Sequence, residues 1–304
     1  MQEHRYQLDS LTVWLTATET AVSEFDQLMS EQERKQKHKH TLTVTVTALT
    51  AAYEIASQAA ASFDLSPLLK IRVFIEGLSS PPSFSVSNVL VLGFDAAPPR
   101  DFTTHKFQQV NLNIAPQTIS TQTTRPPPFK CIPLVPNVPQ ETNSVVLGGT
   151  FDHLHSAHLL LLSVAALLAK SSLICGVYDF SQSQHRLLKK SHYEYMQPLS
   201  LRITAVNFFL HSFKPSLIYR VEPILDDYGP TRYESDIQAI VCSAETEAGC
   251  LAVNQLRQAN NLPLLDIYVI GVVKNAAVVG LADGRNFADK ISSSYLREYL
   301  SQQK

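Results

Sequence analysis

The chain has 304 residues, 45% of them hydrophobic, so it is longer than a usual single domain and can bury a sizeable core. Its formal net charge of −2 gives no global attraction to nucleic acid or to an anionic membrane, and any polyanionic ligand must be held locally. No stretch approaches the roughly 18 apolar residues of a membrane span, and the N-terminus lacks a secretory signal pattern. We therefore expect a cytoplasmic protein without nucleic-acid or membrane partners.

Residues 1–115 predict a small α/β domain without a motif that indicates chemistry. Hydrophobic patterning predicts an amphipathic helix within 11–36, followed by a basic run at 34–40 that we interpret as solvated rather than partner-binding. Alternating apolar residues predict strands, and alanine-rich sequence predicts a helix near 50–63. The strands are expected over 42–49, 71–77 and 88–94.

Residues 116–144 are rich in proline, threonine and glutamine, which predicts an extended linker because few apolar side chains are available to bury. A second domain is expected over 145–304. In it, strand-like runs at 145–149, 172–178, 217–222, 237–242 and 266–273 alternate with helical patterns near 157–169, 198–211, 246–260 and 292–301. This alternation is typical of an α/β fold with a five-stranded parallel sheet covered by helices on both faces.

The first helix of this domain is apolar on every side, so we expect it to be deeply buried. Pro198 suits the first turn of the next helix, where its missing N–H is no loss. In open parallel sheets, ligands bind beyond the carboxyl ends of the strands, near the point where the strand order reverses. The segment that follows the first strand runs through that position.

That segment, residues 145–162, reads VVLGGTFDHLHSAHLLLL and carries three histidines. The spacing H-x-H-x-x-H resembles the H-x-H-x-D-H signature of metallo-β-lactamase-type hydrolases, but Ala157 occupies the position of the required Asp. No downstream His or carboxylate shows an obvious ligand spacing, and the four cysteines form no C-x-x-C pair that would indicate a zinc ribbon or a redox dithiol. We therefore expect no protein-held metal and mostly buried, reduced thiols.

Phosphate binding accounts for more of these residues. Gly148 and Gly149 allow a sharp turn and a close ligand approach, and the helix that starts near His158 offers free N–H groups to an anion. His155 lies three residues before His158, so both rings can face one phosphate chain if the helix begins by then. The alternative is that both histidines are capping or core residues, and for His153 alone we favour that interpretation.

The motif GGTFDHLHSAH resembles the G-[GS]-[TS]-F-D-x-x-H-x-G-H signature of the H-x-G-H nucleotidyltransferases, especially the eukaryotic and archaeal phosphopantetheine adenylyltransferases. Further blocks follow in the order of the family. They are DDYGPT (226–231), IVCSAET (240–246), AVNQLR (252–257), LPLLDIYVI (262–270) and KISSSYLR (290–297). The resemblance covers about half of the chain and does not reach the N-terminal domain.

The resemblance implies a Rossmann-like nucleotidyltransferase domain that transfers an adenylyl group from ATP to 4′-phosphopantetheine, giving dephospho-coenzyme A and pyrophosphate, with Mg²⁺ on the phosphates and no covalent intermediate. We expect this single step, because the sequence holds no G-x-x-x-x-G-K-[ST] loop for the kinase that follows it. Other coenzyme A pathway enzymes are reasonable partners of the N-terminal domain. The alternatives are a related nucleotidyltransferase with another donor, such as a cytidylyl donor, and a non-catalytic nucleotide-binding scaffold.

The resemblance also implies site residues. We expect His158, supported by His155, to stabilise the transition state. Either Lys189 or Lys190 is expected to neutralise the reacting phosphates, and of the two we choose Lys189. Residues expected to bind the acceptor substrate are Thr150, Lys190, Asp227, Tyr228 and Gly229. Residues expected to bind ATP are Gly148, Gly149, Thr150, Phe151, His155, His158, Ser243, Glu245, Thr246, Ser292, Ser293, Ser294 and Arg297.

Some of these assignments leave alternatives open. Arg297 either pairs with phosphates or forms a surface salt bridge. Asp152 either has a structural role, in which it braces the loop or caps the helix, or touches a ligand. The glycine between the motif histidines is replaced by Ala157, whose methyl group either shifts the adenosine or is accommodated by the backbone. Both histidines, the serines and Arg297 are present, so we expect an active enzyme.

Overall fold

The computed structural model describes residues 10–16, 49–50, 52–53, 70–75, 89–93, 107–109, 141–270 and 292–303. Several predicted segments lie outside these residues: the rest of the expected helix at 17–36 with the basic run, the strand at 42–48, the linker at 116–140 and the strand end at 271–273. Within the described ranges, no helix is long and apolar enough to cross a bilayer.

A five-stranded, fully parallel sheet forms the C-terminal half, as the alternating pattern predicted. Its strands, in the spatial order β7-β6-β5-β8-β9, are β5 (Thr142–Gly149), β6 (Ala169–Tyr178), β7 (Ile218–Ile224), β8 (Ala239–Ser243) and β9 (Asp266–Ile270). β5 starts three residues earlier than expected, inside the predicted linker, because Thr142 pairs with Ala169 of β6. Side-chain support comes from Gln238, whose Oε1 accepts a hydrogen bond from Asn143 N at 2.7 Å.

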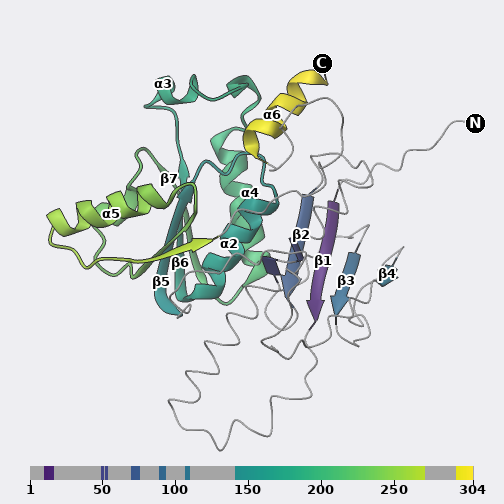
Figure 1. Ribbon diagram of the computed structural model, residues 1–304, viewed down its shortest axis with the longest axis horizontal. Coiled ribbons are helices and arrows are strands. Elements are labelled where there is room, and N and C mark those ends of the chain that lie inside the picture. The colour runs from purple at the N-terminus through teal and green to yellow at the C-terminus, as the bar shows by residue number, and fades with distance from the viewer. Residues whose placement is uncertain are drawn as a thin grey trace, which may run out of the picture.

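Helices connect the strands and cover both faces of this sheet (Figure 1). They are α2 (Ser156–Leu168), α3 (Gln184–Leu187), α4 (Leu199–Phe213), α5 (Glu247–Ala259) and α6 (Ser293–Gln302), with 3-10 turns η2 (Tyr193–Tyr195) and η3 (Gly229–Arg232). Pro198 is the N-cap of α4, one position before the first turn in which it was expected. The short elements α3, η2 and η3 carry no strong periodicity and were not predicted.

The alternation of β5 explains why two cores form. Val145 and Leu147 point to the face covered by α2 and α4, whereas Val146 points to the face that packs on α5. Side chains on successive strand residues point to opposite faces, so a strand buried on both sides reads as a continuous aliphatic run. Each fully buried aliphatic side chain of this kind contributes about 1.5–3 kcal/mol to stability.

The helix α2 is buried as expected, with ten of its thirteen residues inaccessible to solvent. It packs against β5, β6, β8 and α4, and it also contacts β2 of the N-terminal half. Buried residues of that half, such as Tyr53 and Val73, belong to the same hydrophobic core as α2. The apolar residues around α2 thus pack against elements of both halves of the chain.

The described part of the N-terminal half contains a second parallel sheet in the order β2-β1-β3-β4. Its strands are β1 (Ser10–Thr16), β2 (Lys70–Ile75), β3 (Val89–Gly93) and β4 (Phe107–Gln109). The strands predicted at 71–77 and 88–94 correspond to β2 and β3. The helix expected within 11–36 cannot include residues 11–16, which belong to β1 and in which, apart from Trp14, polar and apolar residues alternate with the period of a strand. Leu49, assigned to a strand, is helical.

Candidate functional site

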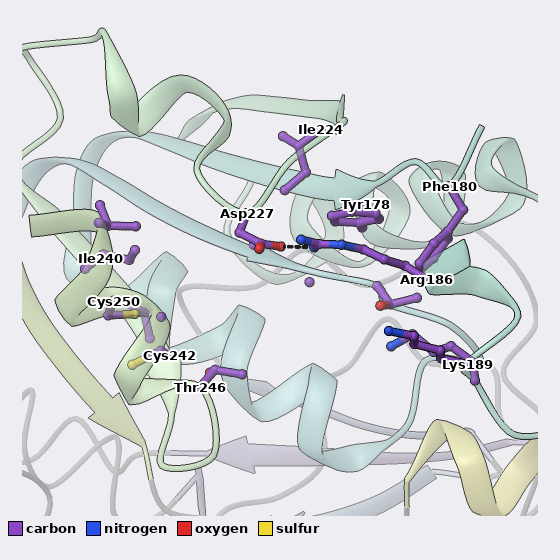
Figure 2. Close-up of a pocket in the computed structure, with 17 residues that line it drawn as sticks. Tyr178, Phe180, Arg186, Lys189, Ile224, Asp227, Ile240, Cys242, Thr246 and Cys250 are labelled. Atoms are coloured by element: carbon purple, nitrogen blue, oxygen red, sulfur yellow. Dashed lines mark hydrogen bonds and ion pairs between the residues drawn. The ribbon is translucent and has the colours of Figure 1, made fainter. Parts of the chain in front are cut away.

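A cleft of about 610 Å³ opens at the carboxyl ends of the C-terminal strands, where the order reverses between β5 and β8 (Figure 2). This is the position at which open parallel sheets bind ligands, and the volume is in the range of small-molecule sites. The lining residues come from the ends of four strands, from the loops that follow them, and from α3 and α5. They are Gly148, Gly149, Thr150, Tyr178, Phe180, Arg186, Lys189, Lys190, Ile224, Asp227, Ile240, Val241, Cys242, Thr246, Gly249, Cys250 and Val253.

Ile224 at the end of β7 fills the space above two glycines. A Cβ on Gly176 of β6 would lie 2.8 Å from Ile224 Cγ2, and a Cβ on Gly229 would lie 2.7 Å from the same atom. Gly229 also has a positive φ of 47°, which disfavours any residue with a side chain. Gly176 was not singled out from the sequence, although a glycine inside an aliphatic strand often marks such a close approach.

The turn after β5 is held in an unusual backbone conformation. Phe151 and His153 have φ angles of 49° and 46°, in the left-handed region that non-glycine residues rarely occupy. Conformations of this kind cost about 1–3 kcal/mol each and persist only when the surroundings impose them. Here the surroundings converge on Asp152, the residue between them.

Asp152 is fully buried and braces the turn from both carboxylate oxygens. Oδ1 accepts a hydrogen bond from Gln197 N at 2.9 Å, and Oδ2 accepts one from Arg297 Nη1 at 2.6 Å. Its backbone carbonyl accepts a third bond from Ser293 Oγ at 2.7 Å. Of the two interpretations left open by the sequence, the structure therefore supports bracing.

Arg202 of α4 ties the ends of two strands together beneath the cleft. Nη1 donates to the carbonyl of Thr150 at 2.7 Å and to that of Tyr178 at 3.0 Å, and Nε donates to that of Gln197 at 3.0 Å. Burial lowers the pKa of this guanidinium. Nothing in the sequence pattern indicated Arg202, because its partners are up to 52 residues away along the chain.

The three motif histidines do not converge on one point. The rings of His155 and His158 stack with centroids 3.9 Å apart, and His158 also lies 5.5 Å from the ring of Phe151. His153 turns away, with Nε2 hydrogen-bonded to the carbonyl of Tyr195 at 2.8 Å, so it supports the fold as we favoured. Among the described residues, no group of three or more His, Cys, Asp or Glu side chains could hold a metal ion.

The histidine pair sits at the start of α2, where His155 is the N-cap residue and His158 is in the first turn. The side chain of His155 does not cap the helix, and the first turn contains no carboxylate. The first amide N–H groups of a helix without such a cap, and its positive dipole end, are suited to bind an anion. Neither imidazole is among the described residues that line the cleft.

Cationic side chains line one end of the cleft. Lys189 is exposed, whereas Lys190 is half-buried with Nζ 5.8 Å from the ring centre of Phe180. Burial lowers the pKa of Lys190, the positive charges of Arg297 and Arg202 lower it further, and Asp152 partly compensates. An ammonium group whose pKa is lowered by burial and by neighbouring cations would gain a counter-charge from a bound phosphate.

Arg186 and Asp227, the second of which was predicted to bind the acceptor substrate, face each other across the cleft (Figure 2). Arg186 Nη1 donates to Asp227 Oδ1 at 2.6 Å, and both side chains are exposed. The hydrogen bond to Asp227 and its charge raise the pKa of Arg186. The sequence did not indicate Arg186, which lies on the unpredicted helix α3.

The first aspartate of the loop DDYGPT stabilises the turn formed by the residues that follow it. Asp226 Oδ1 accepts hydrogen bonds from the backbone N–H groups of Tyr228 and Gly229, at 2.9 and 2.8 Å. The ring of Tyr228 lies 5.5 Å from the guanidinium of Arg232 and packs against the α5 core rather than lining the cleft. Asp227 is the residue of this loop that reaches the cleft.

The predicted ATP-binding residues of the last helix bond to one another and to the turn. Ser292 caps α6 by accepting from Tyr295 N, and Ser294 Oγ accepts from Arg297 Nη2 at 3.1 Å. Arg297 is buried, and its Nε donates to the carbonyl of Ser191 at 2.8 Å. It is therefore not a surface salt bridge, and its phosphate contact stays a prediction.

Three further predicted residues lie at the end of β8 and in the turn that follows it. Thr246 lines the cleft, and its Oγ1 lies 3.2 Å from both the backbone N and the Oγ of Ser243. Glu245 is exposed beside them. The structure thus gathers Gly148, Gly149, Thr150, Lys189, Lys190, Asp227 and Thr246 around one cleft, and it places His155, His158 and the α6 residues outside its lining.

Comparison with known proteins agrees with this arrangement. Residues 146–298 match the model of the cytidylyltransferase-like family. A phosphopantetheine adenylyltransferase of Methanopyrus kandleri is 37% identical over 153 residues, which cover 50% of this chain and 87% of the relative. The phosphopantetheine adenylyltransferase of Saccharomyces cerevisiae is 32% identical over 165 residues, 53% of this chain and 51% of the relative.

An uncharacterized protein of Schizosaccharomyces pombe is 36% identical over 164 residues, 53% of this chain and 50% of the relative. The chain thus spans about half the length of the two yeast relatives and most of the archaeal one. The matched segment contains the glycine turn, the stacked histidines and the residues that line the cleft. The resemblance found in the sequence is confirmed, and the chain belongs to the cytidylyltransferase-like family.

Proposed function

We propose that the protein transfers the adenylyl group of ATP to 4′-phosphopantetheine, producing dephospho-coenzyme A and pyrophosphate. The observation that carries the proposal is the cleft itself, which joins a cationic end at Lys189 and Lys190 to an apolar end at Ile240 and Val253. Such a cleft can hold the phosphates of a nucleotide at one end and its base at the other. The names of the yeast and archaeal relatives support the choice of substrates.

In the proposed reaction, a phosphate oxygen of 4′-phosphopantetheine attacks the α-phosphorus of ATP. A new P–O bond forms, the bond between the α-phosphorus and the bridging oxygen breaks, and pyrophosphate leaves with the electron pair. Alignment of the two anions can lower the barrier by about 7–11 kcal/mol, so residues that position them are central to the rate. Thr150, directly after the glycines, would orient the acceptor phosphate.

The start of α2 would bind the donor phosphates through its first amide groups. His158 would add a hydrogen bond as negative charge develops, and His155 holds its ring by stacking at 3.9 Å. Lys190 would neutralise the same charge from the cationic end of the cleft, with Lys189 nearby. We assign Arg297 a positioning role, because it binds Asp152 and thereby holds the turn that carries Thr150.

Magnesium is proposed to arrive with the nucleotide. Mg²⁺ is commonly held by substrate phosphates, waters and one or two carboxylates rather than by an all-protein cage. The residues described by the structure fit this mode, since Asp227 is the carboxylate that lines the cleft. When bound, the ion would neutralise phosphate charge and leave the residues named above to orient the reactants.

The test is pyrophosphate release by the full chain with ATP and 4′-phosphopantetheine added singly and together. The proposal requires release only when both are present, with dephospho-coenzyme A as the second product. A cytidylyl donor is the second candidate, favoured by the family that the chain matches, and faster turnover with CTP than with ATP would establish it instead. Nucleotide binding without pyrophosphate release under any of these conditions would indicate a scaffold.

A further inference from the structure

Two cysteines share one wall of the cleft. Cys242 lies in β8, one residue before the strand ends, and Cys250 lies on the first turns of α5. Both line the cleft, and each is 5% exposed. In Figure 2 their sulfur atoms lie close together, at the opposite end of the cleft from Lys189. The turn between β8 and α5 therefore brings Cys250 next to Cys242.

The surroundings of the pair favour reaction at Cys250. The interaction between the two neighbouring thiols lowers the pKa of Cys250 and, together with burial, raises that of Cys242. Glu247, in the first turn of α5, opposes ionisation of both. The N-terminal end of a helix stabilises a thiolate, and Cys250 is the thiol that stands there.

The third described cysteine offers a contrast. Cys175 is 0% exposed within β6 and does not line the cleft. Burial alone raises its pKa. A buried thiol in apolar surroundings is inert, whereas a thiol with a helix N-terminus, a second thiol and a cleft beside it can react. The chain thus contains a matched unreactive control within the same domain.

We propose that Cys242 and Cys250 form a dithiol that small oxidants, entering through the cleft, convert reversibly to an intrachain disulfide. The seven intervening residues, 243–249, hide the pair from a search for C-x-x-C spacing. The inference is independent of the proposed function, because it concerns two side chains and an oxidant rather than the transfer reaction. Oxidation would fix the end of β8 to α5 and change the shape of the cleft wall.

With hydrogen peroxide as the oxidant, the chemistry proceeds in two steps. The Cys250 thiolate attacks one peroxide oxygen and the O–O bond breaks, which gives a sulfenic acid and, after protonation, one water. The Cys242 sulfur then attacks the sulfenic sulfur, the S–S bond forms, and hydroxide leaves with the proton of Cys242 as a second water. Two thiols lose two electrons, and one peroxide is reduced to two waters.

The experiment uses the reduced full chain, treated with hydrogen peroxide, alkylated under denaturing conditions and digested with trypsin without reduction. Both cysteines fall on the peptide 233–257, which is bounded by Arg232 and Arg257. We expect this peptide to take up no alkylating label and to be lighter by two hydrogens than the unlabelled dithiol. Treatment with dithiothreitol before alkylation should restore two labels, and Cys175 should keep its label throughout.

Rates and a trapping variant complete the test. We expect loss of label from 233–257 to be about tenfold or more faster than loss from Cys175, with the circular dichroism spectrum unchanged. In Cys242→Ser, the sulfenic acid at Cys250 should persist and be captured by dimedone, and Cys175→Ser should leave the wild-type result unchanged. Retention of both labels on 233–257, a mixed disulfide with the peptide that carries Cys131, or oxidation that dithiothreitol does not reverse would each overturn the proposal.

Discussion

Replacing Asp152 by Asn should destabilise the protein far more than replacing Asp227 by Asn, although both carboxylates lie 2.6 Å from an arginine nitrogen. The side chains of Asp152 and Arg297 are 0% and 2% exposed, whereas those of Asp227 and Arg186 are 60% and 44% exposed. The two ion pairs therefore have the same nitrogen–oxygen distance, but one is buried and the other is exposed to solvent. Burial should decide the difference.

The expected magnitude follows from that contrast. An Asn at 152 that keeps its bond to Gln197 N turns an NH₂ group toward the Arg297 guanidinium, so a buried charge loses its counter-charge and two donors face each other. Breaking a buried pair from one side costs about 3–5 kcal/mol. The exposed pair is worth only about 0–1 kcal/mol, because water screens it and two long side chains must be ordered.

Equilibrium unfolding in urea measures both variants. With a urea dependence of about 1–3 kcal/mol per molar, Asp152→Asn should lower the midpoint by about 2 M, and Asp227→Asn by a few tenths. Far-UV circular dichroism is the appropriate signal, because the single tryptophan, Trp14, lies in β1 and reports on the N-terminal sheet. Equal midpoint shifts for the two variants would refute the reasoning that burial sets the cost.

Three predictions concern the proposed reaction. His158→Ala should lower kcat by about tenfold or more with an unchanged circular dichroism spectrum, and near-normal turnover would remove this ring from its role. Ala157→Gly should keep or improve ATP affinity in calorimetry at a stability cost of about 1 kcal/mol, and a marked loss of affinity would mean that the methyl group is required. Because the pKa of Lys190 is lowered from 10.5, its charge and the ATP affinity should be lost as pH rises, before pH 10.5 is reached. Lys190→Arg should retain affinity over that window, and an identical fall in the arginine variant would assign the titration to another group.

The strands and the longer helices of the C-terminal half were predictable because local pattern and burial agree there. The later residues of β5 and β6 are buried on both faces, so they form short apolar runs such as VVL and LICGVY. The first strand of the chain, β1, was missed because the residues around it favoured a different element. The glutamates and glutamines that follow β1 suggested a helix, and they outweighed the two-residue period of residues 10–16.

The sequence by itself determined the order of the main strands and helices in the C-terminal half, the position of the glycine turn at the carboxyl end of a strand, and the family. Each of these can be recognised from residues that are neighbours in the chain. Only the tertiary structure decided which side chains share the site. Asp152 and Arg297 are 145 residues apart, Thr150 and Arg202 are 52 apart, and the thiols of Cys242 and Cys250 meet through a change from strand to helix. Contacts of this kind depend on how the helices pack against the sheet. A periodicity of 2 or 3.6 residues predicts which face of an element a side chain points to, but not which distant residue it contacts.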